Sequence, residues 1–195
     1  SRRRCQPSFT PARIGIDARK WRDYGIGTYV RNIVRALALI DHENTYFLFC
    51  HHEDVPTLKD LSENFVPVVD ESPGYSLREH WSLPRQLRKL GADLFHEPHY
   101  VLPLLLGTKA VVTVHDCIHL RFPEYLPNPA AIHYARFMMG SAIKRAKVVF
   151  TVSEASRAAL SLCVTDPEGR EIDIDLPGQY PVTPQIKGAI KAMHG

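Results

Sequence analysis

Two residues that could take part in a reaction, His115 and Asp116, follow directly after an apolar run in the segment VVTVHDCIHLRFPE. An imidazole changes its protonation state near neutral pH, so His115 could donate to a ligand hydroxyl or to a developing charge. Open α/β sheets keep their sites beyond the carboxyl ends of the strands, where these residues are expected. The alternative is that His115 only closes the strand by bonding to backbone. We take His115 and Asp116 as the candidate catalytic residues.

A second polar cluster, in the segment FHEPHYVLP, places Glu97 and His99 after another apolar run. We interpret both as candidate contacts to a bound sugar or phosphate, with a solvated loop as the alternative. A third cluster, VSEASR, places Ser153 and Glu154 after a strand-like run. Ser153 is first of all a helix cap, and its place at the same expected edge makes Ser153 and Glu154 secondary candidates for ligand contact.

The histidine spacings also raise the question of a metal site. The pairs His96–His99 and His115–His119 have separations that occur in metal sites. Pro98 interrupts the first pair, so this segment is not a zinc-binding helix of the HExxH kind. We therefore expect no metal. A metal-dependent hydrolase built on His96, His99, His115 and Asp116 is the most distant of the alternatives.

The stretch WRDYGIGTYVRNIVRAL places Gly25 and Gly27 between a strand-like run and an amphipathic helical pattern. Glycine lets a backbone approach a ligand closely, and a helix N-terminus favours an anion. The run Gly25, Ile26, Gly27 and Thr28 is therefore a candidate phosphate-binding loop. Val30 occupies the place of the third glycine of a dinucleotide fingerprint, so a tight turn without a ligand is the alternative. If the loop binds phosphate, Gly27→Val is expected to harm catalysis more than stability.

The elements that must position these residues alternate along the chain. Short apolar runs typical of buried strands occur at 14–18, 46–50, 66–69, 92–96, 110–115 and 148–152. Helical patterns lie between or after them at 27–40, 82–90, 130–146 and 154–162, and the second begins with Ser82 as cap and Pro84 in the first turn. This alternation predicts an α/β fold with a Rossmann-like, doubly wound parallel sheet.

Composition limits the classes of function. The chain has 195 residues and 45% hydrophobic content, enough for a substantial core, and its net charge of +3 predicts no dedicated nucleic-acid surface. Four widely separated cysteines predict buried thiols, with Cys50 and Cys117 in or beside apolar runs, and suit a reducing compartment. No apolar run approaches the roughly 20 residues of a membrane-spanning helix.

Four segments, which occur in the family's order, together resemble the N-terminal lobe of a family 4 glycosyltransferase with the GT-B fold. The first also resembles the mannosyltransferase-like members. These segments are RIGIDARKWRDYGIGTYVRNIVRAL, FHEPHYVLP, VVTVHDCIHLRFPEY and AIKRAKVVFTVSEASRAAL.

The resemblance implies transfer of a sugar, with retention, from a nucleotide-sugar donor such as GDP-mannose to an acceptor hydroxyl. It implies that the loop Gly25–Thr28 approaches the donor phosphates, and that His115 lies by the transferred sugar with Asp116 beside it. No cofactor or divalent metal is expected. The expected partners are the donor and a glycan or lipid-linked acceptor, with no nucleic acid. The expected location is cytoplasmic, at the inner face of a membrane with which the protein makes peripheral contact.

The resemblance covers only part of such an enzyme. The expected organisation is a disordered end at 1–12, the lobe at 13–164, and a linker strand with an unassigned tail at 165–195. The family's second lobe, which holds most donor contacts, has no counterpart in these 195 residues. We therefore expect a second lobe or chain, and little turnover without it. The alternative is a non-catalytic remnant that binds an acceptor or a partner protein.

Overall fold

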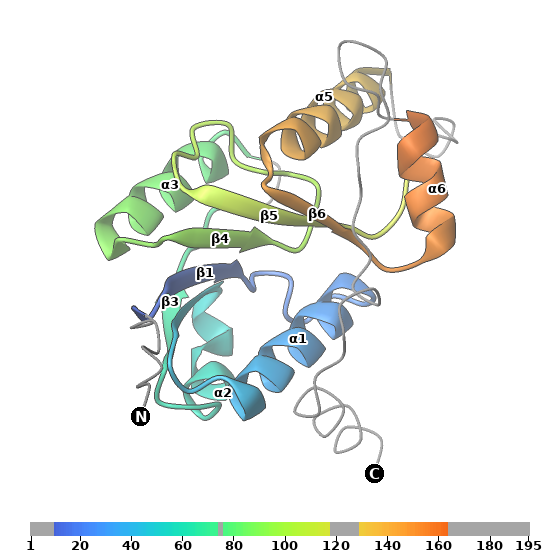
Figure 1. Ribbon diagram of the computed structural model, residues 1–195. Helices are drawn as coiled ribbons and strands as arrows, with labels where there is room; N and C mark the ends of the chain where they lie inside the picture. The colour runs from blue at the N-terminus through green and yellow to red at the C-terminus, as the bar shows by residue number, and fades with distance from the viewer. Residues whose placement is uncertain (1–9, 74–75, 118–128, 164–195) are drawn as a thin grey trace, which may run out of the picture.

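The computed structural model describes residues 10–73, 76–117 and 129–163 of the chain. Its centre is one sheet of six parallel strands in the order β3-β2-β1-β4-β5-β6 (Figure 1). The strands are β1 (Arg13–Asp17), β2 (Thr45–Cys50), β3 (Phe65–Val69), β4 (Leu94–Glu97), β5 (Lys109–Val114) and β6 (Val148–Thr151). The doubly wound parallel sheet predicted from the sequence is thereby confirmed. His119, residues 1–9 and the expected tail at 165–195 lie outside the described residues.

Helices cover both faces of the sheet. In Figure 1, α1 and α2 lie below the strands, whereas α3 and α5 lie above them. The helical elements are α1 (Ile26–Ile40), the short η1 (His52–Asp54) and α2 (Val55–Lys59), α3 (Glu79–Leu90), α5 (Pro129–Arg145) and α6 (Glu154–Cys163). Within the described residues, no helix is long and apolar enough to cross a lipid bilayer.

The two faces carry separate cores because side chains alternate along each strand. Ile16 of β1 and Leu48 of β2 pack with Val30 and Val34 of α1 on one face. On the other face, the core contains the residues Phe49, Phe95, Leu83, Leu87, Val112 and Met139. The buried, reduced thiols of Cys50 and Cys117 confirm the interpretation of these two cysteines. This packing fixes which residues of each strand face which helix at the edge of the sheet.

The start of α3 differs from its prediction. The helix begins at Glu79, so Ser82 is not its cap and Pro84 lies inside it. Ser82 instead donates its hydroxyl to Asp70 over 2.6 Å. Pro84 lies beyond the first turn and removes one helical hydrogen bond, and its burial in the core together with Leu83 and Leu87 offsets this cost. Pro84 predicts a helix start near Ser82, but the burial of one helix face extends the helix back to Glu79.

Candidate functional site

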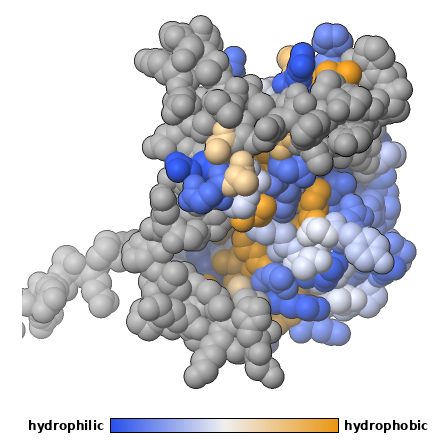
Figure 2. Space-filling view, turned by 90° about the vertical axis from the view of Figure 1, so that its right-hand side faces the viewer, coloured by the Kyte–Doolittle hydropathy of each residue, from blue (hydrophilic) through white to orange (hydrophobic). Residues whose placement is uncertain are grey.

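The candidate residues gather at the carboxyl edge of the sheet, where all six parallel strands end. Figure 2 faces this edge, and on its described part a hydrophobic strip runs between hydrophilic residues. His115 follows the last residue of β5, and Glu97 is the last residue of β4. Two groups form there. We call Tyr29, His96, Thr113 and His115 the His115 cluster, and we describe a neighbouring cavity around Arg19 below.

His115 is held by the loop after β4. Its Nε2 lies 3.0 Å from the carbonyl oxygen of Pro98. A carbonyl only accepts, so Nε2 carries a proton and Nδ1 holds the lone pair of the neutral ring. Burial lowers the pKa of His115, although the bond to Pro98 and the charge of Asp116 oppose this effect. Asp116 itself is exposed. The neutral imidazole at neutral pH is thus suited to accept a hydroxyl proton at Nδ1.

Tyr29 of α1 connects the glycine loop to this histidine. Its ring stands edge-on to the ring of His115, with centroids 5.0 Å apart, and to that of His96, 6.2 Å away. The Tyr29 hydroxyl lies 2.9 Å from Thr113 Oγ1, which lies 2.9 Å from His96 Nε2. Burial, followed by the nearby His115, lowers the pKa of His96 to about 4. His96 is therefore a neutral core residue that supports the cluster from below.

His96 and His115 already have hydrogen-bond partners. Within the described part of the chain, no group of three or more His, Cys, Asp or Glu side chains is arranged to hold a metal ion. Nε2 of His96 is hydrogen-bonded to the Thr113 hydroxyl, and Nε2 of His115 is hydrogen-bonded to the Pro98 carbonyl. His119 of the second spaced pair lies outside the described residues.

The two glycines of the candidate phosphate loop have different roles. Gly25 precedes α1 with a φ of 62°, and an added Cβ would meet no atom within 4 Å. A Cβ on Gly27 would lie 2.5 Å from the carbonyl oxygen of Lys20 and 2.9 Å from that of Trp21. Gly27 therefore lets α1 pack against the loop after β1. A valine at position 27 would force these backbone atoms to move, so Gly27→Val is expected to cost more stability than a strained turn alone.

Ile26 and Thr28 complete this loop. Ile26 is half-buried, whereas Thr28 is exposed and accepts a hydrogen bond from Arg31 at 2.8 Å. The first turn of α1 contains no acidic residue, so its N–H groups face no built-in negative charge. The loop thus offers an anion the positive end of a 15-residue helix next to the His115 cluster.

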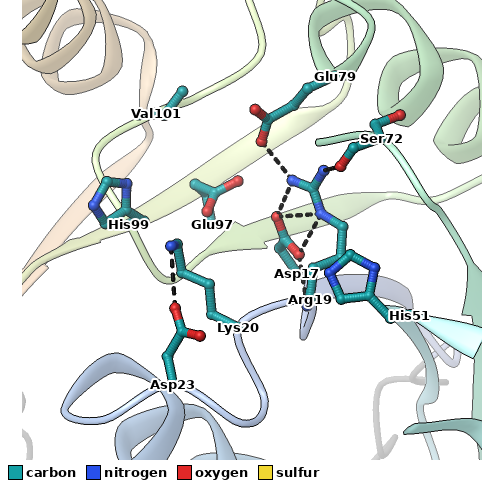
Figure 3. Close-up of a pocket in the computed structure, with 10 residues that line it drawn as sticks. All are labelled: Asp17, Arg19, Lys20, Asp23, His51, Ser72, Glu79, Glu97, His99 and Val101. Carbon is teal, nitrogen blue, oxygen red and sulfur yellow. Dashed lines mark hydrogen bonds and ion pairs between the residues drawn. The ribbon is translucent and has the colours of Figure 1, made fainter. Parts of the chain in front are cut away.

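A polar cavity of about 170 Å³ lies beside the cluster, and we call it the Arg19 pocket (Figure 3). It opens at the ends of β1, β2 and β4, and its wall includes the start of α3. The lining residues are Asp17, Arg19, Lys20, Asp23, His51, Ser72, Glu79, Glu97, His99 and Val101.

Arg19 organises this pocket through a buried charge network. Its Nη2 lies 2.5 Å from both Asp17 and Glu79, and its Nη1 donates to the Ser72 carbonyl at 3.2 Å and lies 3.9 Å from Asp70. Burial opposes the ionisation of Asp17, but the charge and hydrogen bonds of Arg19 outweigh it and lower the pKa of Asp17. Arg19 therefore stays charged and fixed in orientation.

Glu97 is the exception in this network. Only 3% of the residue is exposed, and its Oε2 has no hydrogen-bond partner among the described residues. Burial raises the pKa of Glu97 well above its usual range, and the charge of Asp17 adds to the rise. Glu97 thus faces the pocket with unused hydrogen-bonding capacity, and burial favours its protonated form. His99 lines the same pocket and stacks at a tilt on Tyr100.

The start of α6 reaches the same edge. Ser153 Oγ accepts from the Ser156 backbone N–H at 3.1 Å, which confirms Ser153 as the helix cap. Ser156 donates its hydroxyl to the His115 carbonyl at 2.8 Å. Glu154 is exposed and pairs with Arg157 at 3.0 Å. Ser153 is thus connected to the main chain of His115 through Ser156. The Glu154 side chain contacts Arg157 of its own helix.

Several residues of the site were not identified from the sequence. Asp17 ends a strand as Glu97 does, and Arg19 closely follows it, so their position was a usable signal. Tyr29 lies within the helical pattern expected at 27–40, where a hydroxyl on a half-buried ring was a weaker signal. Glu79 gave no such signal, because only the tertiary fold brings it to Arg19.

Comparison with known proteins identifies the class. The family model for Glycosyltransferase Family 4 matches residues 24–168, most of the chain, so this chain belongs to that family. No curated protein matches it significantly.

Solved structures agree on the fold. A sucrose-phosphate synthase chain from Thermosynechococcus elongatus superposes with a TM-score of 0.56 at 14% identity, covering 93% of this chain and 96% of that one. A UDP-glucosyltransferase from Polygonum tinctorium, in complex with 3,4-dichloroaniline, gives a TM-score of 0.50 at 10% identity, covering 87% of this chain. This chain spans 52% of that enzyme. The sheet is therefore a Rossmann-like lobe of the kind found in GT-B glycosyltransferases.

Proposed function

We propose that this chain is the acceptor-binding lobe of a retaining glycosyltransferase that moves mannose from GDP-mannose to an acceptor hydroxyl. The observation that carries the proposal is the contact of Tyr29 with His115, which places the glycine loop and the catalytic candidate at one sheet edge. The family match supports sugar transfer. The choice of mannose rests on the resemblance of the glycine-loop segment to mannosyltransferase-like members.

In this proposal the donor diphosphate lies at the start of α1, against Gly25, Ile26, Gly27 and Thr28. The bond from sugar C1 to the phosphate oxygen breaks as the bond from C1 to the acceptor oxygen forms on the same face. The acceptor proton leaves with the diphosphate. Backbone N–H groups of α1 stabilise the charge that builds on the leaving group. His115 orients the transferred sugar through Nδ1, and Asp116 lies beside it.

The acceptor lies in the Arg19 pocket. The carboxyl of Glu97 donates to an acceptor oxygen, while the carboxylates of Asp17 and Glu79, which Arg19 holds in place, accept from hydroxyls. His99 lies on the wall of the same pocket, and Ser153 and Glu154 provide outer contacts. Such a mixture of fixed donors and acceptors suits a polyhydroxylated acceptor, which is either a glycan or the head group of a lipid-linked one.

A second lobe supplies the remaining donor contacts. The chain spans about half of the UDP-glucosyltransferase that it resembles. The resemblance to family 4 enzymes implies that a second lobe holds most donor contacts. A protein without such a lobe would bind an acceptor but transfer nothing, which is the alternative of a non-catalytic binding remnant.

The test uses the natural protein together with its second lobe. Nucleoside diphosphate release is measured with GDP-mannose, UDP-glucose and UDP-N-acetylglucosamine, and the anomeric configuration of the product is read by NMR. GDP-mannose should be preferred, with retention. Glu97→Gln keeps one donor and the shape of the carboxyl, so it should raise the acceptor KM more than it lowers kcat. An inverted product would refute retention, and release from no donor would favour the binding remnant.

A further inference from the structure

One outer face of the lobe combines positive charge with exposed apolar side chains. It is formed by α3 and the loop between β4 and β5. We call it the α3 face and define it by the residues Arg78, Trp81, Arg85, Arg88, Lys89 and Leu105. At about 100° per residue, its five positions at the start of and within α3 fall within an arc of about 100°. All five are exposed, so they form one stripe.

The charge of this stripe is not neutralised within its helix. The only acidic residue of α3 is Glu79, which is buried and paired with Arg19. Arg85 lies over the ring of Trp81 at 5.1 Å, so the guanidinium and the indole are presented together. Arginines bind phosphate groups in a bidentate manner. The stripe thus offers four cations to a phosphate-bearing surface.

Apolar side chains lie next to these cations. Trp81 is 57% exposed and Leu105 is 61% exposed, and both line one open hollow with Arg85 and Arg88. The Leu104 N–H lies 3.3 Å from His80 Nδ1, which anchors this loop to α3. A nucleic acid or a wholly acidic surface would leave the leucine and the indole without apolar partners. The interface of a bilayer accommodates phosphate contacts and apolar side chains together.

We propose that the α3 face binds the surface of a bilayer that contains anionic phospholipids, and thereby presents the Arg19 pocket to a lipid-linked acceptor. The same helix connects the two sites, because Glu79 lines the pocket only two residues before Trp81. A head group held at the bilayer surface would then enter the pocket beside the start of α3. The delivery of the acceptor rests on the function proposed above, whereas the binding of the bilayer does not.

The first test measures binding of the full chain to vesicles by sedimentation. Vesicles of phosphatidylcholine mixed with phosphatidylglycerol should bind the protein, vesicles of phosphatidylcholine alone should bind it weakly, and salt should weaken binding. The double variant Arg85→Gln/Arg88→Gln should lower the partition coefficient at least about tenfold. The matched control, Arg136→Gln/Lys144→Gln, removes the same charge from exposed positions of α5 and should change it little.

The second test locates the contact. The chain has two tryptophans, and Trp21 is buried whereas Trp81 is exposed. Anionic vesicles should shift the fluorescence emission to the blue in the natural chain but not in Trp81→Phe, which should still sediment with vesicles. Because Trp81 lies on the surface, circular dichroism should show an unchanged fold.

Three results would overturn the proposal: no binding to anionic vesicles, equal losses in the α3 and α5 variants, or a blue shift that survives Trp81→Phe. Transferase assays separate this failure from that of the proposed function. With a water-soluble acceptor, the α3 double variant should match the natural protein. With the acceptor embedded in anionic vesicles, it should be slower by about the loss in partitioning.

Discussion

At the scale of single residues, Tyr29 has two separable roles. Its ring contacts His115, and its hydroxyl bonds to Thr113. Tyr29→Phe keeps the ring, so it should cost about 1 kcal/mol of stability and leave kcat nearly unchanged. Tyr29→Ala removes the support of His115 and should lower kcat at least about tenfold. Urea unfolding and steady-state kinetics of both variants measure these effects, and equal kcat losses would contradict the assignment of the ring as the support.

The lowered pKa of His96 predicts how the free energy of unfolding depends on pH. Its pKa is lowered to about 4 in the folded protein, from 6.5, so the unfolded chain binds more protons between these values. Stability should therefore fall as the pH drops from about 6.5 to 4, by on the order of 3 kcal/mol from this group. In His96→Gln this contribution should vanish.

Urea unfolding of both proteins across this range measures the difference. Glu97 also titrates, and because its pKa is raised in the folded protein, its contribution to stability decreases as the pH rises, whereas that of His96 increases. Because Glu97 is present in both proteins, the difference between them isolates His96. Identical pH profiles would show that His96 is not held neutral by its surroundings.

The site was only partly accessible from sequence, for a physical reason. A polar residue directly after an apolar run must lie at the sheet edge, which is how His115 and Glu97 were identified. The partners of those residues come from other elements. Glu79, which is 60 positions from Arg19, meets it only in the tertiary fold, where Leu83 and Leu87 of α3 share a core with the sheet. Pairings of this kind depend on tertiary packing, which local patterns do not encode.

At the scale of elements, the strands were more predictable than the helix ends. Buried parallel strands are marked by β-branched and aromatic runs, and all six expected runs correspond to strands. The short η1 and α2 went unnoticed because a five-residue helix is too short to show a period. The start of α3 was misplaced because Pro84 suggested a first turn.

The turn before α1 offers a comparison between neighbouring glycines. Gly25→Ala introduces a side chain into open space at a φ of 62° and a ψ of −85°, a sparsely populated conformation, which should cost about 1–3 kcal/mol. Gly27→Val forces atoms against the carbonyls of Lys20 and Trp21, so it should cost more and lower the melting temperature further. If the loop binds the diphosphate, Gly25→Ala should also raise the donor KM.

Thermal unfolding and donor titration of both variants measure these effects. An unchanged donor KM in a folded Gly25→Ala protein would leave Gly25 as a turn residue only. A Gly27→Val protein as stable as the natural one would contradict the packing role of Gly27.

At the scale of the whole molecule, the lobe has the Arg19 pocket, the His115 cluster and an anion-favouring helix start at one edge. The charges that would hold a donor diphosphate are few here, because Arg19 is committed to three buried carboxylates. Loss of even two charge-assisted contacts, at about 1.5–3 kcal/mol each, weakens donor binding more than tenfold. Catalysis is therefore expected to require the second lobe.

The central claim is that His115 acts in a glycosyl transfer that this chain completes only with a second lobe. The most direct measurement is the turnover of GDP-mannose by the 195-residue chain alone and together with that lobe, each with and without His115→Ala. We predict negligible turnover by the chain alone, turnover when the lobe is present, and a loss of about 10²–10⁴-fold in the variant. Robust turnover by the chain alone, or full activity of a folded His115→Ala protein, would contradict the account.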